Sequence, residues 1–241
     1  MPWERVILGK SSILLVVMVK KAKNPPFFKN PNSQLGAALL LFIAAAVLAR
    51  GGQMASWELS VFNFIYGLPI ALTPFFFLIT QLGNITVFFI LAGVYFIQRQ
   101  YRIVVRLFLS GLLAYLLAGV AKDLLGRPRP AELIIDVISR DLYTRGPGFP
   151  SGHAALGTAV ALTLGYHLPK KYQWLVPVVV VLLCVSRIFL GVHAPLDVVG
   201  GFAIGWGTYA LFRNVRVSDI HRHVIKRSAS VLKKSRVRTK H

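Results

Sequence analysis

The sequence predicts an all-α integral membrane protein with six transmembrane helices and short interfacial helices on the outer side. The 241 residues are 55% hydrophobic and only 15% charged, which is too apolar for an ordinary soluble domain. Mean hydropathy is +0.62 although the net charge is +20, so the basic residues must gather in a few segments. The single cysteine, Cys184, allows no internal disulfide.

Six apolar stretches alternate with polar segments, and small or apolar neighbours extend most of them toward the ~20 residues that a membrane span needs. They cover residues 35–49, 74–97, 103–121, 153–168, 175–185 and 196–212. The aromatic stretch at 53–73 carries one charge, Glu58, and is expected to form short helices at the outer interface. The apolar run at 13–19 is too short to span and is followed by lysines, so we expect an interfacial piece without signal-peptide cleavage.

The distribution of charge orients these spans. Of the 28 Lys and Arg residues, 21 lie in four blocks, at 1–34, 98–106, 170–171 and 213–241. The other seven share the intervening segments with six of the eight acidic residues. Six spans place the four basic blocks on one face, which the positive-inside rule assigns to the cytoplasm. Both termini are therefore expected in the cytoplasm, with the basic tail near anionic lipid headgroups rather than nucleic acid.

The chain is expected to form one membrane domain with two basic extensions. The six-span domain covers 35–212, the N-terminal cytoplasmic or interfacial segment covers 1–34, and the cytoplasmic tail covers 213–241. No internal repeat or Gly/Pro-rich linker divides the domain. Gly201-x-x-x-Gly205 gives the last span a thin face, which favours close packing against another span of the same chain over homodimerisation.

Polar residues gather at the predicted outer ends of four different spans. These groups are Lys122 with Arg127-Pro128-Arg129-Pro130, Pro150-Ser151-Gly152-His153, Ser186-Arg187, and His193 through Asp197. Lys122, Arg129 and Arg187 supply positive charge, and guanidinium groups match phosphate oxygens with paired hydrogen bonds. Ser151 and Gly152 are expected at a helix N-terminus, where free backbone N–H groups favour an anion. Together these residues predict a phosphate site.

Two histidines suit two different roles at such a site. His193 and Asp197 are four residues apart, and Pro195 between them suits the first turn of a helix, so the carboxylate can reach the imidazole. A carboxylate at one ring nitrogen leaves the other nitrogen free to attack phosphorus. His153, on another span, is expected to be protonated and to donate to the leaving oxygen. Each residue alone is better explained as an interfacial side chain, but their joint spacing favours catalysis.

At these positions the chain resembles the type 2 phosphatidic acid phosphatase superfamily of membrane lipid phosphatases, which shares its site with vanadium haloperoxidases. The three elements are KDLLGRPRP from Lys122, PSGH from Pro150, and SRIFLGVHAPLD from Ser186. The resemblance implies that His193 becomes a phosphohistidine, Asp197 is its partner and His153 is the acid. It implies phosphate binding by Lys122, Arg129, Ser151, Gly152 and Arg187, with no metal or cofactor. Arg127 duplicates the Arg-Pro pair two residues early and is held in reserve.

The function that this resemblance implies is hydrolysis of a lipid phosphomonoester or pyrophosphate at the outer side of a cytoplasmic membrane. Polyprenyl pyrophosphate such as undecaprenyl pyrophosphate, phosphatidylglycerol phosphate and phosphatidic acid are the family's usual substrates. Two alternatives remain open: a phosphotransferase that passes the phosphoryl group to a lipid acceptor, and a non-catalytic transporter or scaffold with the same fold. The oligomeric state is not predicted.

Overall fold

The computed structural model describes residues 30–141 and 146–213, and every regular element in these ranges is helical. The longer helices are α1 (Pro31–Ala49), α2 (Ser56–Tyr66), α4 (Ile85–Ile97), α6 (Leu113–Leu125), α8 (Gly152–Gly165), α9 (Leu175–Phe189) and α10 (Pro195–Phe212). The shorter elements are η2 (Ile70–Leu72), α3 (Thr73–Thr80), η3 (Gln81–Gly83), α5 (Tyr101–Leu107), the π-helical turn η4 (Phe108–Leu112), α7 (Pro130–Leu133) and η5 (Lys170–Tyr172). The expected all-α class is therefore confirmed for the described part of the chain.

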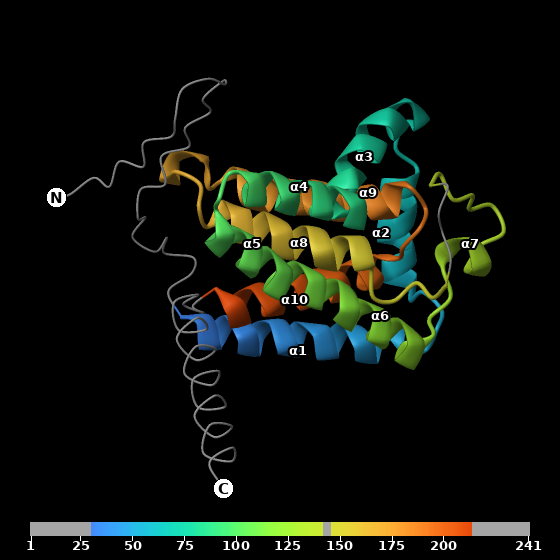
Figure 1. The fold of residues 1–241 in the computed structure, drawn as a ribbon. Helices are drawn as coiled ribbons and strands as arrows, with labels where there is room; N and C mark the ends of the chain where they lie inside the picture. The colour runs from blue at the N-terminus through green and yellow to red at the C-terminus, as the bar shows by residue number, and fades with distance from the viewer. Residues whose placement is uncertain (1–29, 142–145, 214–241) are drawn as a thin grey trace, which may run out of the picture.

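The helices form a bundle with two helices set across one end. Figure 1 shows α1, α4, α8, α9 and α10 lying alongside the rod formed by α5, η4 and α6. Helix α10 packs against both α1 and α8, which makes it the central element. Helices α2 and α3 stand steeply inclined at the end shown on the right of Figure 1. This end carries the loops that join α6 to α8 and α9 to α10.

The two ends of the described chain meet at the opposite end of the bundle. The start of α1 and the end of α10 lie together there (Figure 1), and Arg213 Nη1 donates to Gln34 Oε1 at 3.2 Å. The side of the membrane on which the termini themselves lie stays a prediction. The basic segments predicted at 1–34 and 213–241, including the apolar run at 13–19, lie almost wholly outside the described residues.

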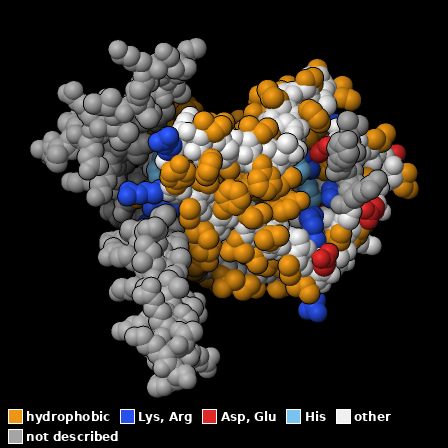
Figure 2. Space-filling model, in the orientation of Figure 1, with side chains coloured by type: hydrophobic (Ala, Val, Ile, Leu, Met, Phe, Trp, Pro, Cys, Tyr) orange, Lys and Arg blue, Asp and Glu red, His pale blue; other side chains and the backbone are white. Residues whose placement is uncertain are grey.

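The surface of the bundle is apolar, as a lipid environment requires. Figure 2 shows hydrophobic side chains covering the middle of the visible face, with charged and His side chains gathered at its two ends. Large side chains point outward along the helices, among them Leu40 at 70% exposure, Ile97 at 81% and Leu124 at 79%. Water would disfavour such a surface, whereas hydrocarbon does not. We conclude that this is a multi-pass membrane protein.

Length and hydropathy together identify three helical segments able to cross a membrane. They are Asn32–Ala49, Tyr101–Leu133 and Lys170–Phe189. A fourth span is possible if the pair Ser56–Tyr66 and Ile70–Gly83, bent by 77°, counts as one. Helices α4 and α8 are apolar but have only 13 and 14 residues. Six spans therefore stay a prediction.

One predicted span differs from the structure. Residues 74–97 were expected to form a single helix, but the chain breaks after η3, and α4 starts anew at Ile85. Asn84 causes this break, because its extended backbone leaves the helix while its side chain accepts a hydrogen bond from Thr86 N at 2.9 Å. Only α4 joins the bundle, and α3 stands beside it. The stretch at 53–73 contains the short helices α2 and η2. Their expected place at the outer interface stays a prediction.

Close packing of α10 against α8 depends on two glycines. A Cβ atom at Gly201 would overlap Ser151 O, and one at Gly205 would overlap Ala155 O. Their absence lets the backbones of α8 and α10 approach each other, so that the N-termini of both helices lie side by side. The expectation that this glycine motif packs within the chain is confirmed.

We expect Gly205→Ala to destabilise the protein by about 1–3 kcal/mol, because the methyl group must push α8 away from α10. Gly119→Ala is the matched control in α6, since a Cβ atom there meets no atom within 4 Å. It should be neutral or slightly stabilising, because alanine favours a helix. Thermal unfolding of the detergent-solubilised protein measures both. Equal unfolding temperatures for the two variants would contradict this account of the packing.

Candidate active site

All the motif residues lie at one end of the bundle. Figure 1 places the C-terminal ends of α6 and α9 and the N-terminal ends of α8 and α10 at the end opposite to the start of α1 and the end of α10. These four helix ends carry Lys122, Arg187, His153 and Asp197, in that order. Arg129 and His193 lie in the adjoining loops. Segments up to 75 residues apart in sequence are thereby brought to one place.

His193 faces the carboxylate of Asp197. Its Nδ1 lies 3.6 Å from Asp197 Oδ2, slightly beyond hydrogen-bond distance, and has no hydrogen-bond partner among the described residues. The backbone N–H of His193 donates to Arg187 O at 3.3 Å, which ties the loop to the end of α9. Asp197 Oδ2 accepts from Ala194 N at 2.8 Å, so the first turn of α10 orients the carboxylate. This leaves the Nε2 side of the ring turned away from Asp197.

The imidazole of His193 is held in its neutral form. It is only 2% exposed, and burial together with the positive charges of Lys122, Arg187 and Arg129 keeps the pKa of His193 well below 6.5. A neutral ring keeps a lone pair available for attack at neutral pH.

Arg187 is buried with a donor to spare. Its Nη1 donates to Thr80 Oγ1 at 2.6 Å and to Asp141 Oδ2 at 3.0 Å. Its Nε, by contrast, is buried with no hydrogen-bond partner in the described parts of the chain. An unsatisfied buried donor costs about 1–3 kcal/mol, so a ligand oxygen there would be stabilising. Neither Thr80 nor Asp141 was singled out from sequence, where nothing marks them as partners of Arg187.

Two further cations are held by backbone carbonyl groups. Arg129 donates from Nε to Gly146 O at 2.8 Å and from Nη1 to Val192 O at 2.9 Å. Lys122 Nζ donates to Pro147 O at 2.5 Å and to Gly148 O at 3.4 Å. These contacts fix both cations against the loop that precedes α8. The loop and the cations therefore form one wall of the site.

The N-terminus of α8 supplies backbone donors. Ser151 is the N-cap, with its Oγ accepting from Ala154 N at 3.4 Å and its own N–H donating to Asp197 O at 2.8 Å. A Cβ atom at Gly152 would meet only the Tyr115 ring, at 3.9 Å. The first turn of α8 is thus open beside Gly152, and its N–H groups and helix dipole favour an anion there.

Arg127 is part of a buried ionic network, a role that the sequence did not indicate. All five of its N–H donors are engaged. The acceptors are Gly52 O (3.3 Å), Gln53 O (3.2 Å), Glu58 Oε1 (3.0 Å), Glu58 Oε2 (2.7 Å) and Asp197 Oδ1 (2.9 Å). Arg127 therefore has no donor left for a phosphate, and the spacing that favoured Arg129 for that role is consistent with the geometry. The sequence signal that was missed is Glu58, a lone acid in an apolar stretch.

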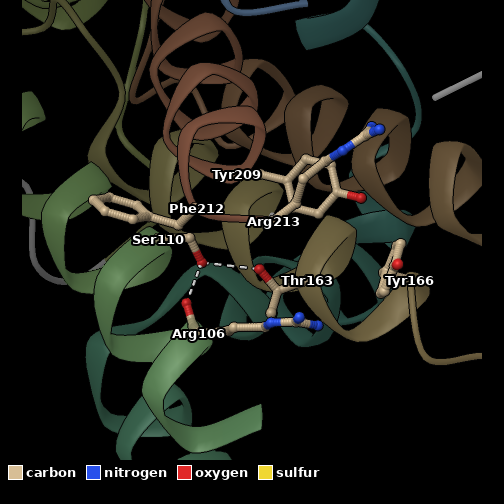
Figure 3. A pocket seen from close by; sticks show the side chains of 7 residues that line it. All are labelled: Arg106, Ser110, Thr163, Tyr166, Tyr209, Phe212 and Arg213. Atoms are coloured by element: carbon tan, nitrogen blue, oxygen red, sulfur yellow. Dashed lines mark hydrogen bonds between the residues drawn. The ribbon is translucent and has the colours of Figure 1, made fainter. Parts of the chain in front are cut away.

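A polar pocket at the other end of the bundle has different chemistry. Figure 3 shows its lining, which comes from α5, η4, α8, α10 and the residues that directly follow α8 and α10: Arg106, Ser110, Thr163, Tyr166, Tyr209, Phe212 and Arg213. The Ser110 and Thr163 hydroxyl groups are hydrogen-bonded at 2.8 Å. The pocket lies beside the C-terminal ends of α8 and α10, where helix dipoles favour cations over anions. It contains none of the motif residues.

Similarity to known proteins agrees with this geometry. The family model of the PAP2 superfamily, the type 2 phosphatidic acid phosphatases, matches residues 103–219. The crystal structure of Aquifex aeolicus LpxE superimposes with a TM-score of 0.59 at 30% identity, covering 65% of this chain and 96% of that one. The chain belongs to the PAP2 superfamily. Membership of this superfamily explains both the resemblance in the motifs and the helical bundle.

Other PAP2 relatives share most of the chain. An undecaprenyl-diphosphatase of Sulfolobus acidocaldarius is 28% identical over 187 residues, or 75% of this chain and 89% of that protein. A transmembrane PAP2-type phosphatidylglycerolphosphate phosphatase of Bacillus subtilis has a TM-score of 0.59 at 25% identity, covering 75% of this chain and 94% of that one. These relatives are phosphatases that act on lipid phosphates, which supports phosphatase activity for this PAP2 protein.

Proposed function

We propose that the protein hydrolyses a lipid phosphomonoester or pyrophosphate without a metal ion, through a phosphohistidine at His193. The observation that carries the proposal is a buried, neutral imidazole held between the Asp197 carboxylate and three cations, Lys122, Arg129 and Arg187. Such a ring is a nucleophile, and such cations stabilise the charge on the oxygens of a phosphoryl group in transfer. Within the described ranges, no three His, Cys, Asp or Glu side chains are grouped as metal ligands.

The reaction proceeds in two steps at phosphorus. His193 Nε2 forms a bond to phosphorus while the bond to the lipid oxygen breaks, and His153 gives its proton to that oxygen. Water then attacks the phosphohistidine, its proton passes to His153, and inorganic phosphate leaves. Asp197 stabilises the imidazolium that forms during attack. The open first turn of α8 beside Gly152, the Ser151 hydroxyl group and the unpaired Nε of Arg187 bind the phosphate oxygens.

The substrate is amphipathic in this proposal, because the site lies at the end of a bundle whose sides are apolar. Polyprenyl pyrophosphate, phosphatidylglycerol phosphate and phosphatidic acid are the candidates. The names of two relatives, an undecaprenyl-diphosphatase and a phosphatidylglycerolphosphate phosphatase, support the first two. Hydrolysis is preferred to transfer to a lipid acceptor for the same reason. Membrane lipids are the partners that we expect, with anionic headgroups near the basic tails.

We place the active site on the outer side of the cytoplasmic membrane, with both termini inside. In a Cys184→Ala background, Asp136→Cys should react with an impermeant maleimide in intact cells, because residue 136 lies near the site. Gln98→Cys, exposed beside basic residues, should react only after permeabilisation. Labelling of both positions from the same side would refute the orientation.

Phosphate release tests the reaction. The purified protein, given each of the three lipid phosphates with no acceptor lipid, should release inorganic phosphate from at least one. Release should persist in EDTA and be inhibited by orthovanadate, which resembles the trigonal bipyramidal phosphoryl group. A dependence on acceptor lipid would favour a phosphotransferase. Loss of activity in EDTA with recovery on adding Mg²⁺ would contradict the metal-free mechanism.

The two histidines should respond differently to the leaving group. His153→Ala should lose about 10²–10⁴-fold in kcat/KM on a lipid alkyl phosphate, the usual contribution of a general acid, and much less on an activated aryl phosphate. His193→Ala should fail on both, because no leaving group replaces the nucleophile. Measuring kcat/KM for both variants on both substrates decides the assignment. Selective recovery of His193→Ala on the aryl phosphate would mean that the roles are reversed.

A further inference from the structure

Two carboxylates and one guanidinium are buried together behind the site. Glu58 comes from α2, Arg127 from the loop after α6, and Asp197 from the first turn of α10. The side chains are 0%, 1% and 0% exposed. Arg127 binds both oxygens of Glu58, at 2.7 and 3.0 Å, and one oxygen of Asp197, at 2.9 Å. We refer to these three residues as the acidic triad.

Glu58 also holds the backbone of α10. Its Oε1 accepts a hydrogen bond from Leu196 N at 3.0 Å, next to Asp197 in the first helical turn. Glu58 therefore fixes the carboxylate of Asp197 twice, once through the guanidinium of Arg127 and once through the backbone of the helix. A side chain that served only to pack α2 would need neither the contact with Arg127 nor the contact with the backbone of α10. An apolar side chain is the usual residue at a buried position in such a stretch.

The charge of the triad explains why a second carboxylate is present. Arg127 and Asp197 alone would form an ion pair with no net charge. Such a pair would do little to offset the effect of the surrounding cations on the protonation of His193. With Glu58 ionised, the triad carries one net negative charge on the side that faces Nδ1 of His193. This charge favours the imidazolium that forms when His193 attacks, because opposite charges attract strongly where water is absent.

We propose that Glu58 is a positioning residue of the phosphoryl-transfer site, which aims the Asp197 carboxylate at His193 and keeps the charge behind it negative. This inference rests on the proposed function, because Glu58 acts only through Asp197. Glu58 does not touch the reacting atoms. Its role is to set how well Asp197 supports His193.

The expected pH effect follows from the groups around His193. Those that face it are Asp197 of α10, Lys122 of α6, Arg187 of α9, His153 of α8 and Arg129 of the loop after α6, with Arg127 and Glu58 behind Asp197. Removing the charge of Glu58 leaves the cations unchanged, so protonated His193 becomes less favoured. The acid limb of kcat/KM should then move to lower pH, and the less basic ring should attack more slowly.

The test compares Glu58→Gln with Asp136→Asn, which changes an exposed acid on a nearby loop. Glu58→Gln should lower kcat by about tenfold, comparable to losing an outer partner of a reactive histidine, with a smaller change in KM. Its acid limb should lie about half a pH unit below that of the wild type. Asp136→Asn should leave both unchanged. A folded Glu58→Gln protein with wild-type kcat and acid limb would overturn the proposal.

Folding is checked by thermal unfolding in detergent, and Glu58→Asp covers the case in which Glu58→Gln does not fold. Glu58→Asp keeps the charge, but its shorter side chain moves the carboxylate away from Arg127 and Leu196 N. We therefore expect kcat to fall while the acid limb stays near that of the wild type. A wild-type kcat in this variant would overturn the proposal. If neither variant folds, Glu58 serves the fold alone and the proposal is wrong.

Failure of this inference can be told apart from failure of the proposed function. A wild-type protein that releases no phosphate, or an Asp197→Asn variant with wild-type kcat/KM, defeats the proposed function. An active wild type with a defective Asp197→Asn variant and an unaffected Glu58→Gln variant defeats only the role of Glu58.

Discussion

The Asp197 carboxylate is the interaction on which this site depends. It is fully buried at the start of α10, faces His193, and is bound by Arg127 and by the backbone N–H of Ala194. A buried carboxylate with fewer partners would cost several kcal/mol or take up a proton. The network around Asp197 therefore both permits the charge and aims it. Because Glu58, Arg127 and Asp197 come from three separate segments, this network also joins α2 and the loop after α6 to α10.

The helical bundle explains how residues far apart in sequence meet. Glycines let α10 pack tightly on α8, so that the N-termini of these helices lie together with Ser151 beside Asp197. The N-terminal ends of both helix dipoles, and the open first turn of α8, point toward the same end as Lys122, Arg129 and Arg187. An anion is attracted there, whereas the pocket at the opposite end lies beside helix C-termini, whose dipoles disfavour an anion. The bundle thus has one end suited to phosphate and an apolar side suited to a lipid chain.

Much of this was predictable from sequence, because hydropathy and motif spacing are local properties. The all-helical class, the PAP2 family and the packing role of Gly201 and Gly205 were predicted correctly. The break at Asn84 was missed, because a cap inside a long apolar run does not alter average hydropathy. The partnership of Glu58 with Arg127 was missed because it joins residues 69 apart, and no local pattern encodes such a contact.

The central claim is that His193 carries the phosphoryl group between the lipid and water. Its most direct test is to quench the protein with denaturant during turnover of a lipid phosphate that bears a radiolabelled phosphoryl group, and then to map the label. The account predicts a covalent label that is stable in alkali, labile in acid, confined to the peptide containing His193 and absent from His193→Ala. Turnover with no label on His193, or with the label on another residue, would contradict it.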